Sequence, residues 1–320
     1  MTSLHITLLT VLSLLSQSPQ ARADIFYVST ANLNTVDKLD SSGSVSVFAS
    51  AGFGLNYPLG LAFDSSGDLF VANFGNSTIE EFSSNGTGSV FATSASGLNE
   101  PEGLAFDSSG DLFVANFGNS TVEEFSSNGT GSVFATSASG LNYPGAIAFD
   151  NSGNLYVANG GNDTVERFTT NGQASVFIAS GISPAGLAYH DGDLYVANYS
   201  TGTIEKFNAL GQGSIFASTN LLTLPYGLAF DSSGNLFVAN HGNGEVLEFD
   251  SNGVGTVFAS GLGNAIDLAI EEIPEPSGIL LVSLALPILF LPCVAASFSR
   301  GAHYRRRHSQ HPRSAKKGTP

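Results

Sequence analysis

Residues 101–143 read PEGLAFDSSGDLFVANFGNSTVEEFSSNGTGSVFATSASGLNY, and residues 58–100 read PLGLAFDSSGDLFVANFGNSTIEEFSSNGTGSVFATSASGLNE. The two segments differ at three of 43 positions. These differences are Leu59/Glu102, Ile79/Val122 and Glu100/Tyr143. A unit repeated so closely indicates that the fold is an array of one supersecondary motif.

Further, less similar copies of this unit follow along the chain. Five copies open on a proline, and the spacings between successive prolines are 43, 43, 40 and 41 residues. The prolines are Pro58, Pro101, Pro144, Pro184 and Pro225. A fixed period of about 40 residues is typical of repeat proteins in which each copy forms one supersecondary unit.

Each copy predicts four short strands. In the second copy we expect them at 103–106, 111–116, 121–125 and 131–135. The Asp107–Gly110 turn sequence separates the first two, because Asp can form an Asx turn and Gly accepts a positive φ. Asn128-Gly129 is a strong hairpin signal between the last two. Four strands per 40 residues predict the blade of a β-propeller.

The two ends of the repeat region are complementary. Residues 26–29, 35–39 and 44–49 match the second, third and fourth strands of a unit, while 266–270 match a first strand. Together they make one blade, so the chain predicts an all-β, six-bladed propeller with four-stranded antiparallel blades over 24–272, closed without free edges. A barrel of six strand pairs or an open solenoid would leave the complementary ends unexplained.

Composition excludes several protein classes. The chain has 320 residues, a net charge of -16, one Cys and no Trp, so an intramolecular disulfide and a Cys-based zinc site are excluded. Residues 24–272 contain three basic and 26 acidic side chains, a charge of −23. This balance argues against nucleic acid as a partner, because phosphate requires a basic surface.

The first 23 residues predict a secretory signal peptide. Residues 6–15 form a short apolar run, and Ala21-Arg22-Ala23 is a cleavage motif, which puts the mature N-terminus at Asp24. An uncleaved N-terminal anchor is the alternative.

The last 48 residues, 273–320, differ in character from the repeats. Residues 278–298 carry no charge and are long enough for a transmembrane helix. The basic tail 299–320 follows, and the positive-inside rule places it in the cytoplasm with the acidic body on the other side of the membrane.

A Pro274-Glu275-Pro276 triplet precedes this helix, and Arg305, Arg306 and Arg307 follow it. This order resembles the PEP-CTERM sorting signal of Gram-negative bacteria. The resemblance implies recognition and cleavage by an exosortase, after Sec export and a transient inner-membrane stage with the body in the periplasm. It also implies delivery to the cell surface or the extracellular matrix.

The pattern Pro-x-Gly-Leu-Ala-Phe-Asp followed by Gly-Asn-Leu-Phe-Val-Ala-Asn, as at 225–240, resembles the NHL repeat. It is also similar to the six-bladed family of gluconolactonases and senescence marker protein (SMP-30). That second resemblance implies a divalent metal, such as Ca²⁺, on the propeller axis, with Glu102, Asn159 and Asn198 as possible ligands. A virginiamycin lyase-like enzyme, with His241 as its histidine, is a further alternative.

The residues themselves favour a binding module over an enzyme. The first two copies are nearly identical, whereas an active site needs unlike groups to converge. Each Asn that ends a second strand is more simply a cap for its own loop, and the Asp-Ser-Ser-Gly turns lack a full calcium ligand series. We therefore expect no cofactor.

Aromatic side chains recur in the loops of one rim, and exposed aromatics among amides and acids suit stacking on sugar rings or contact with a protein. This candidate ligand-binding rim comprises Phe74, Phe117, Tyr199, Tyr226 and His241. The sequence thus predicts an exported, non-catalytic module that binds a polysaccharide or a surface protein. A metal-dependent lactonase-like hydrolase is the alternative.

Overall fold

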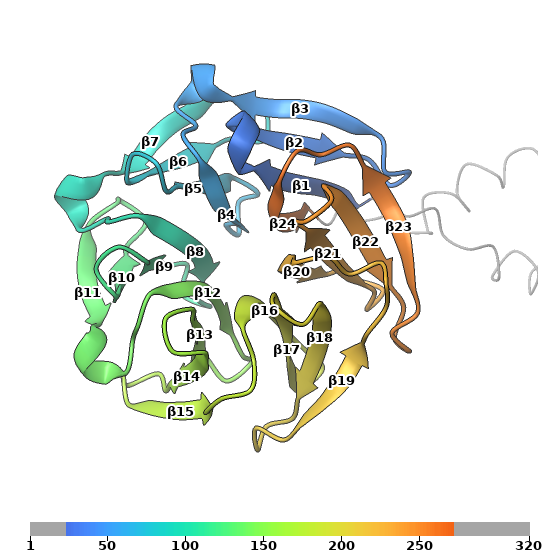
Figure 1. The fold of residues 1–320 in the computed structure, drawn as a ribbon. Helices are drawn as coiled ribbons and strands as arrows, with labels where there is room; N and C mark the ends of the chain where they lie inside the picture. The colour runs from blue at the N-terminus through green and yellow to red at the C-terminus, as the bar shows by residue number, and fades with distance from the viewer. Residues whose placement is uncertain (1–23, 272–320) are drawn as a thin grey trace, which may run out of the picture. The chain divides into compact units, whose positions relative to one another are not determined.

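The computed structural model describes residues 24–271, which form a six-bladed β-propeller (Figure 1). Each blade is a four-stranded antiparallel sheet. In five blades the strands follow one another from the central axis to the circumference in chain order, and in the sixth the last strand of the chain is innermost. The predicted all-β fold, blade number and blade composition are confirmed. The signal peptide and the segment 273–320 with its predicted membrane helix lie outside the described residues. Within 24–271, no helix is long and apolar enough to span a membrane.

The five continuous blades begin at the five repeat prolines. Blade 1 comprises β4 (Pro58–Phe63), β5 (Leu69–Asn73), β6 (Thr78–Phe82) and β7 (Gly88–Ala92). Blade 2 comprises β8 (Pro101–Phe106), β9 (Leu112–Asn116), β10 (Thr121–Phe125) and β11 (Gly131–Ala135). Blade 3 comprises β12 (Pro144–Phe149), β13 (Leu155–Asn159), β14 (Thr164–Phe168) and β15 (Ala174–Ile178). Blade 4 comprises β16 (Pro184–His190), β17 (Asp193–Asn198), β18 (Thr203–Phe207) and β19 (Gly213–Ala217). Blade 5 comprises β20 (Pro225–Phe230), β21 (Leu236–Asn240), β22 (Glu245–Phe249) and β23 (Gly255–Ser260).

Blade 6 joins the two ends of the repeat region, as the complementary strand patterns predict. It comprises β24 (Ala265–Glu271), β1 (Ile25–Thr30), β2 (Thr35–Leu39) and β3 (Val45–Ser50). The register of β1 against β24 pairs Phe26 with Ile270 and Val28 with Leu268. Short 3₁₀ turns follow the second strand of blade 6 and the fourth strands of blades 6, 1 and 2, at Ala31–Leu33, Ala51–Phe53, Ser94–Ser96 and Ser137–Ser139.

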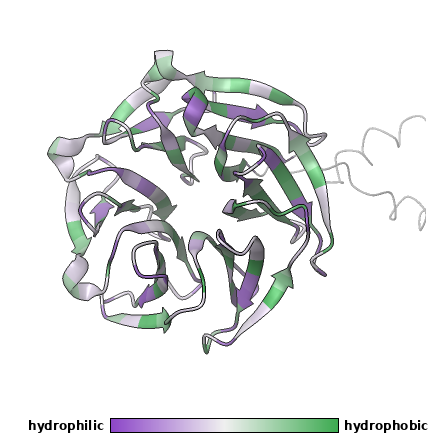
Figure 2. Cartoon of the chain, viewed as in Figure 1, coloured by the Kyte–Doolittle hydropathy of each residue, from purple (hydrophilic) through white to green (hydrophobic). Residues whose placement is uncertain are grey.

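The hydrophobic core lies between the blades. One cluster joins Phe70, Ala72 and Ile79 of blade 1 to Val114 and Phe125 of blade 2, and equivalent clusters join the other neighbours. The second strands are buried along their whole length, because blades pack against both of their faces. Figure 2 shows more hydrophilic residues on third strands such as β10, β14 and β18.

In four of the six blades, the innermost strand approaches its neighbour too closely for a side chain at one repeat position. A Cβ on Gly103 would lie 2.4 Å from the Gly145 carbonyl oxygen, and one on Gly186 would lie 1.9 Å from the Tyr226 oxygen. The close approach favours glycine in these blades, whereas blade 3 carries Ala146 at the same position. In blade 6 the equivalent residue is Asp267, whose Oδ2 accepts a hydrogen bond of 3.0 Å from the Leu61 backbone N–H. Asp267 therefore links the last strand of the ring to the first complete blade.

Candidate functional site

The rim that carries the loops between second and third strands surrounds a cavity of about 670 Å³. All five predicted rim residues line it. They are Phe74, Phe117, Tyr199, Tyr226 and His241. A second cavity of about 150 Å³ shares Phe117, Tyr199 and Tyr226 with it and adds Tyr143. We call this joint concavity the aromatic funnel.

Aromatic rings flank the funnel in two arcs. In the first, Tyr57, Phe74, Phe117 and Tyr143 follow one another with ring centroids 5.9, 5.9 and 5.0 Å apart. In the second, Tyr199 lies 6.0 Å from Tyr226 and 6.1 Å from His241. Such spacings are those of interacting aromatic pairs. These residues come from several blades and lie far apart in the sequence, so it is the propeller fold that brings them together.

Two of these tyrosines are held in a strained backbone conformation. Tyr57 and Tyr143 have φ values of 52° and 49°, although each precedes a proline and neither is glycine. Their backbone N–H groups donate to Asn34 Oδ1 (2.6 Å) and Ser120 Oγ (3.0 Å), and these bonds fix the geometry. The side chains remain about half exposed, at 45% and 49%. Glu100 and Leu224 have the same conformation at the equivalent positions, with φ values of 50° and 52°, so the conformation belongs to the repeat; before blades 1 and 3 it places an aromatic ring at the cavity mouth.

The floor of the funnel is built from the residues that follow the blade-opening prolines. These residues lie next to the propeller axis. They are Leu59, Glu102, Gly145, Ala185 and Tyr226, with Ile266 at the equivalent place in blade 6. Because only Glu102 and Tyr226 of this set are polar, they determine the chemistry of the floor.

Glu102 is 8% exposed and lies where the funnel meets a central channel of about 250 Å³. Burial raises its pKa from 4.5 to about 7, the hydrogen bond that Tyr226 Oη donates to Oε1 lowers it, and the charge of Asp267 raises it further. Burial also raises the pKa of Asp267, to about 6. Burial, followed by the charge and the hydrogen bond of Glu102, raises the pKa of Tyr226 well above its usual value. Sequence analysis missed this Glu102–Tyr226 contact, because the two residues are 124 positions apart.

The raised pKa makes the stability of the fold depend on pH. Ionisation of buried Glu102 is unfavourable, so its contribution to stability is full below pH 4.5 and is lost as pH rises through about 7. Glu102→Gln keeps an acceptor for Tyr226 but cannot ionise. We expect the change in unfolding free energy that it causes to be more stabilising at pH 8 than near pH 4.5, by up to about 3 kcal/mol. Urea unfolding at both pH values measures this, with exposed Glu100→Gln as a control for net charge. A pH-independent effect of Glu102→Gln would contradict the assignment.

The structure does not bring Asn159 and Asn198 to the funnel with Glu102. Both amides are buried and bonded within their own blades. Asn159 Oδ1 accepts from the Asn142 N–H at 3.0 Å, and Asn198 Oδ1 accepts from the Ser183 N–H at 3.0 Å. Three further second-strand asparagines tether a loop in the same way, namely Asn73, Asn116 and Asn240. These contacts are those of loop caps, and the donor set does not fit the implied axial metal.

The other positions considered for a metal ion also lack a suitable set of ligands within 24–271. No group of three or more His, Cys, Asp or Glu side chains within 24–271 is arranged to hold a metal ion. In the turn of blade 2, Asp107 Oδ1 accepts backbone N–H bonds from Ser109 (2.8 Å) and Asp111 (2.9 Å), which is an Asx turn.

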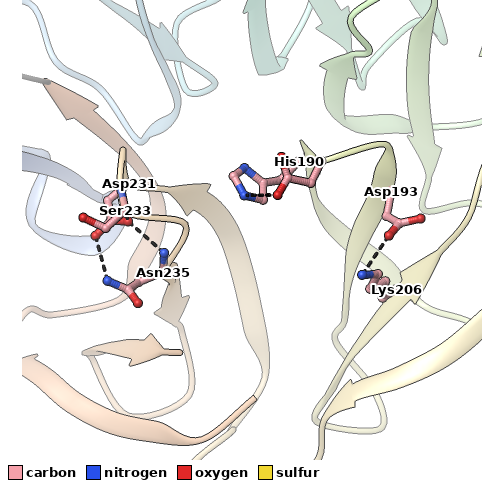
Figure 3. A network of polar contacts seen from close by, with 7 residues as sticks. His190, Asp193, Lys206, Asp231, Ser233 and Asn235 are labelled. Atoms are coloured by element: carbon pink, nitrogen blue, oxygen red, sulfur yellow. Dashed lines mark hydrogen bonds and ion pairs between the residues drawn. The ribbon is translucent and has the colours of Figure 1, made fainter. Parts of the chain in front are cut away.

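The two histidines of the propeller lie on opposite faces. His241 lines the funnel; its Nδ1 is buried without a hydrogen-bond partner, and burial lowers its pKa. His190 lies at the far end of the blades, where its ring stacks on Phe230 with centroids 4.2 Å apart and Nε2 is 3.4 Å from Asp191 (Figure 3). They cannot act in one site.

Comparisons with known proteins agree with the fold. The NHL repeat model matches residues 55–82 and 98–125, so the chain carries NHL repeats. No curated protein matches the sequence.

Several solved structures resemble the propeller. One described as a nidogen/laminin complex is 18% identical with a TM-score of 0.68, covering 79% of this chain and 100% of that chain. A virginiamycin B lyase from Staphylococcus aureus is 14% identical with a TM-score of 0.59, covering 73% and 80%. A gluconolactonase from Xanthomonas campestris is 21% identical with a TM-score of 0.58, covering 66% and 78%. At these identities the likeness concerns the fold.

Proposed function

We propose that this protein is a non-catalytic binding module whose aromatic funnel holds a neutral polysaccharide. The observation that carries the proposal is the convergence of Tyr57, Phe74, Phe117, Tyr199 and Tyr226 on one cavity of about 670 Å³. Aromatic faces pack against the apolar faces of sugar rings, and polar groups at the edges fix their orientation.

The charges of the propeller favour an uncharged ligand. The three basic residues within 24–271 are Lys38, Arg167 and Lys206, each one position before the end of a third strand. Third strands begin at the loops of the funnel rim and run away from it, so these cations lie toward the opposite face. The funnel itself contains Glu102, whose ionised form would repel an acidic polymer.

The terminal segments support a role outside the cell. The predicted signal peptide with cleavage after Ala23 would deliver the chain to the exporter, and the Pro274-Glu275-Pro276 signal would present it to an exosortase. We infer that the mature protein reaches the cell surface or the extracellular matrix, where polysaccharides are abundant.

Binding to immobilised neutral and acidic polysaccharides, with and without EDTA, tests the proposal. We expect saturable binding to a neutral polymer that EDTA leaves unchanged, because no metal is assigned to the funnel. Binding only to a protein of the cell envelope, or binding that EDTA abolishes, would contradict it.

Hydrolysis is a second candidate function, favoured by the pKa of about 7 for Glu102 at the mouth of the channel. A carboxyl group with that pKa can act as a general acid or base near neutral pH. This candidate predicts that the protein hydrolyses a lactone, that EDTA leaves the rate unchanged, and that Glu102→Gln abolishes the hydrolysis. A panel of lactones showing no turnover above the spontaneous rate would exclude it.

A further inference from the structure

In each blade, one residue of the second strand lies directly opposite one residue of the third strand, and the two residue types change together from blade to blade. On the second and third strands, directly opposite residues are either Phe with Glu or Tyr with a basic residue. The first type comprises Phe70/Glu81, Phe113/Glu124 and Phe237/Glu248. The second type comprises Tyr27/Lys38, Tyr156/Arg167 and Tyr195/Lys206. The exchange introduces a hydroxyl and a positive charge at the face opposite the funnel.

Both lysines of this set have partners within the structure. Lys206 Nζ lies 2.7 Å from Asp193 Oδ2 (Figure 3) and 5.4 Å from the ring centroid of Tyr195. Lys38 Nζ lies 5.2 Å from the ring centroid of Tyr27. These contacts give the lysines a structural role.

Arg167 differs from the lysines because the Nε of its guanidinium is buried without a hydrogen-bond acceptor. A buried donor without an acceptor is unfavourable, and arginine is the side chain best suited to a carboxylate. Nothing in the fold requires arginine here, since three other blades carry Glu at the same position.

Arg167 lines a cavity of about 200 Å³ between blades 3 and 4. The cavity is large enough for a ring-sized molecule, since an engineered cavity of about 150 Å³ binds benzene. Tyr156 and Tyr189 line it as well, with their rings stacked at 6.4 Å and 16°. Tyr189 occupies a position that is Phe in blades 1, 2, 3 and 5. Three departures from the sequence of blades 1 and 2, namely Tyr156, Arg167 and Tyr189, therefore line this cavity.

The one acidic residue of the cavity, Asp150, is already engaged. Its Oδ1 accepts from the N–H groups of Ser152 (2.9 Å) and Asn154 (2.8 Å). Its Oδ2 accepts from Asn154 Nδ2 (2.7 Å) and Tyr156 Oη (3.4 Å). Four donors compensate this carboxylate, whereas the buried Nε of Arg167 has no acceptor.

We propose that the cavity between blades 3 and 4 binds a ring-sized organic carboxylate, such as an acidic sugar unit, through Arg167. The tyrosine hydroxyls and the stacked rings would contact the sugar ring. The site lies on the face opposite the funnel, so the propeller would hold two chemically different sugars at once.

Titration calorimetry of the full chain in mild detergent tests this site with galacturonate and galactose, which share a ring but differ in the carboxylate. We expect galacturonate to bind and galactose to leave this site empty. Arg167→Glu restores the residue of blades 1, 2 and 5 and should weaken galacturonate binding at least about 10-fold, as expected for losing a charged hydrogen bond. Lys206→Gln removes a nearby but paired cation and should change the affinity less than about 3-fold.

Several results would overturn the proposal. These are equal affinity for both sugars, no binding of either, binding of sulfate in place of galacturonate, and affinity that survives Arg167→Glu. Equal losses from Arg167→Glu and Lys206→Gln would show a general charge effect and would also overturn it. Circular dichroism of Arg167→Glu verifies that the blade is folded, and the combined Tyr156→Phe/Arg167→Glu variant, which recreates the blade 2 pair, provides a second folded comparison.

Discussion

Simultaneous replacement of Phe74, Phe117, Tyr199 and Tyr226 by alanine is expected to reduce affinity for a neutral polysaccharide by at least about 100-fold. Truncating one aromatic anchor commonly weakens binding by about 2 kcal/mol, and 1.4 kcal/mol is a factor of ten. All four side chains line the funnel, so the variant removes most of its aromatic surface. Calorimetry or surface plasmon resonance measures the loss.

A matched control is Phe53→Ala, which removes an exposed aromatic ring (52%) from a short 3₁₀ turn of the same rim. It should bind like the parent. Tyr226→Ala also leaves Glu102 without its hydrogen-bond donor, so the thermal midpoint of each variant must be measured separately. Retained affinity in a folded quadruple variant would remove the funnel as the binding site.

Removing β24 is expected to abolish cooperative folding. A chain that ends at Gly263 loses the buried Ile266 and Leu268, which together contribute roughly 3–6 kcal/mol. It also exposes the backbone edge of β1 and loses the Asp267 bond to Leu61. Net stabilities of domains are about 5–15 kcal/mol, so this loss is of the same order.

The comparison is with a chain that ends at Glu271 and keeps the whole strand. Urea unfolding followed by circular dichroism should show one steep transition for the longer chain and none for the shorter. Equal transition midpoints would mean that the ring does not need its composite blade.

Much of the fold was predictable because the chain repeats itself. The prolines at 58, 101 and 144 gave the blade boundaries, and the unmatched strands at both ends gave the closure. The rim aromatics were also predictable, since loops at equivalent repeat positions must meet on one face. Phe74 and Phe117, for example, occupy the same position in two successive repeats, so they were expected to lie on the same rim.

Contacts between distant, non-equivalent residues were not predictable. The bond between Tyr226 and Glu102 joins blades 5 and 2 across the axis, and no spacing in the sequence encodes it. Asn159 and Asn198 appeared as possible ligands because a sequence shows residue types but not which amide oxygens already accept a hydrogen bond. The paired exchange of Tyr156 and Arg167 was present in the sequence, yet its meaning depends on the strand register.

Fluorine NMR of fluorotyrosine-labelled protein tests the central claim most directly. Of the eight tyrosines within 24–271, four line the funnel and four lie toward the opposite face. The funnel group is Tyr57, Tyr143, Tyr199 and Tyr226, and the other group is Tyr27, Tyr156, Tyr189 and Tyr195. Tyr→Phe variants assign the signals. Adding an oligosaccharide of the neutral polymer that the protein binds should shift the signals of the funnel group alone. Shifts confined to the second group, or no shifts at all, would contradict binding in the aromatic funnel.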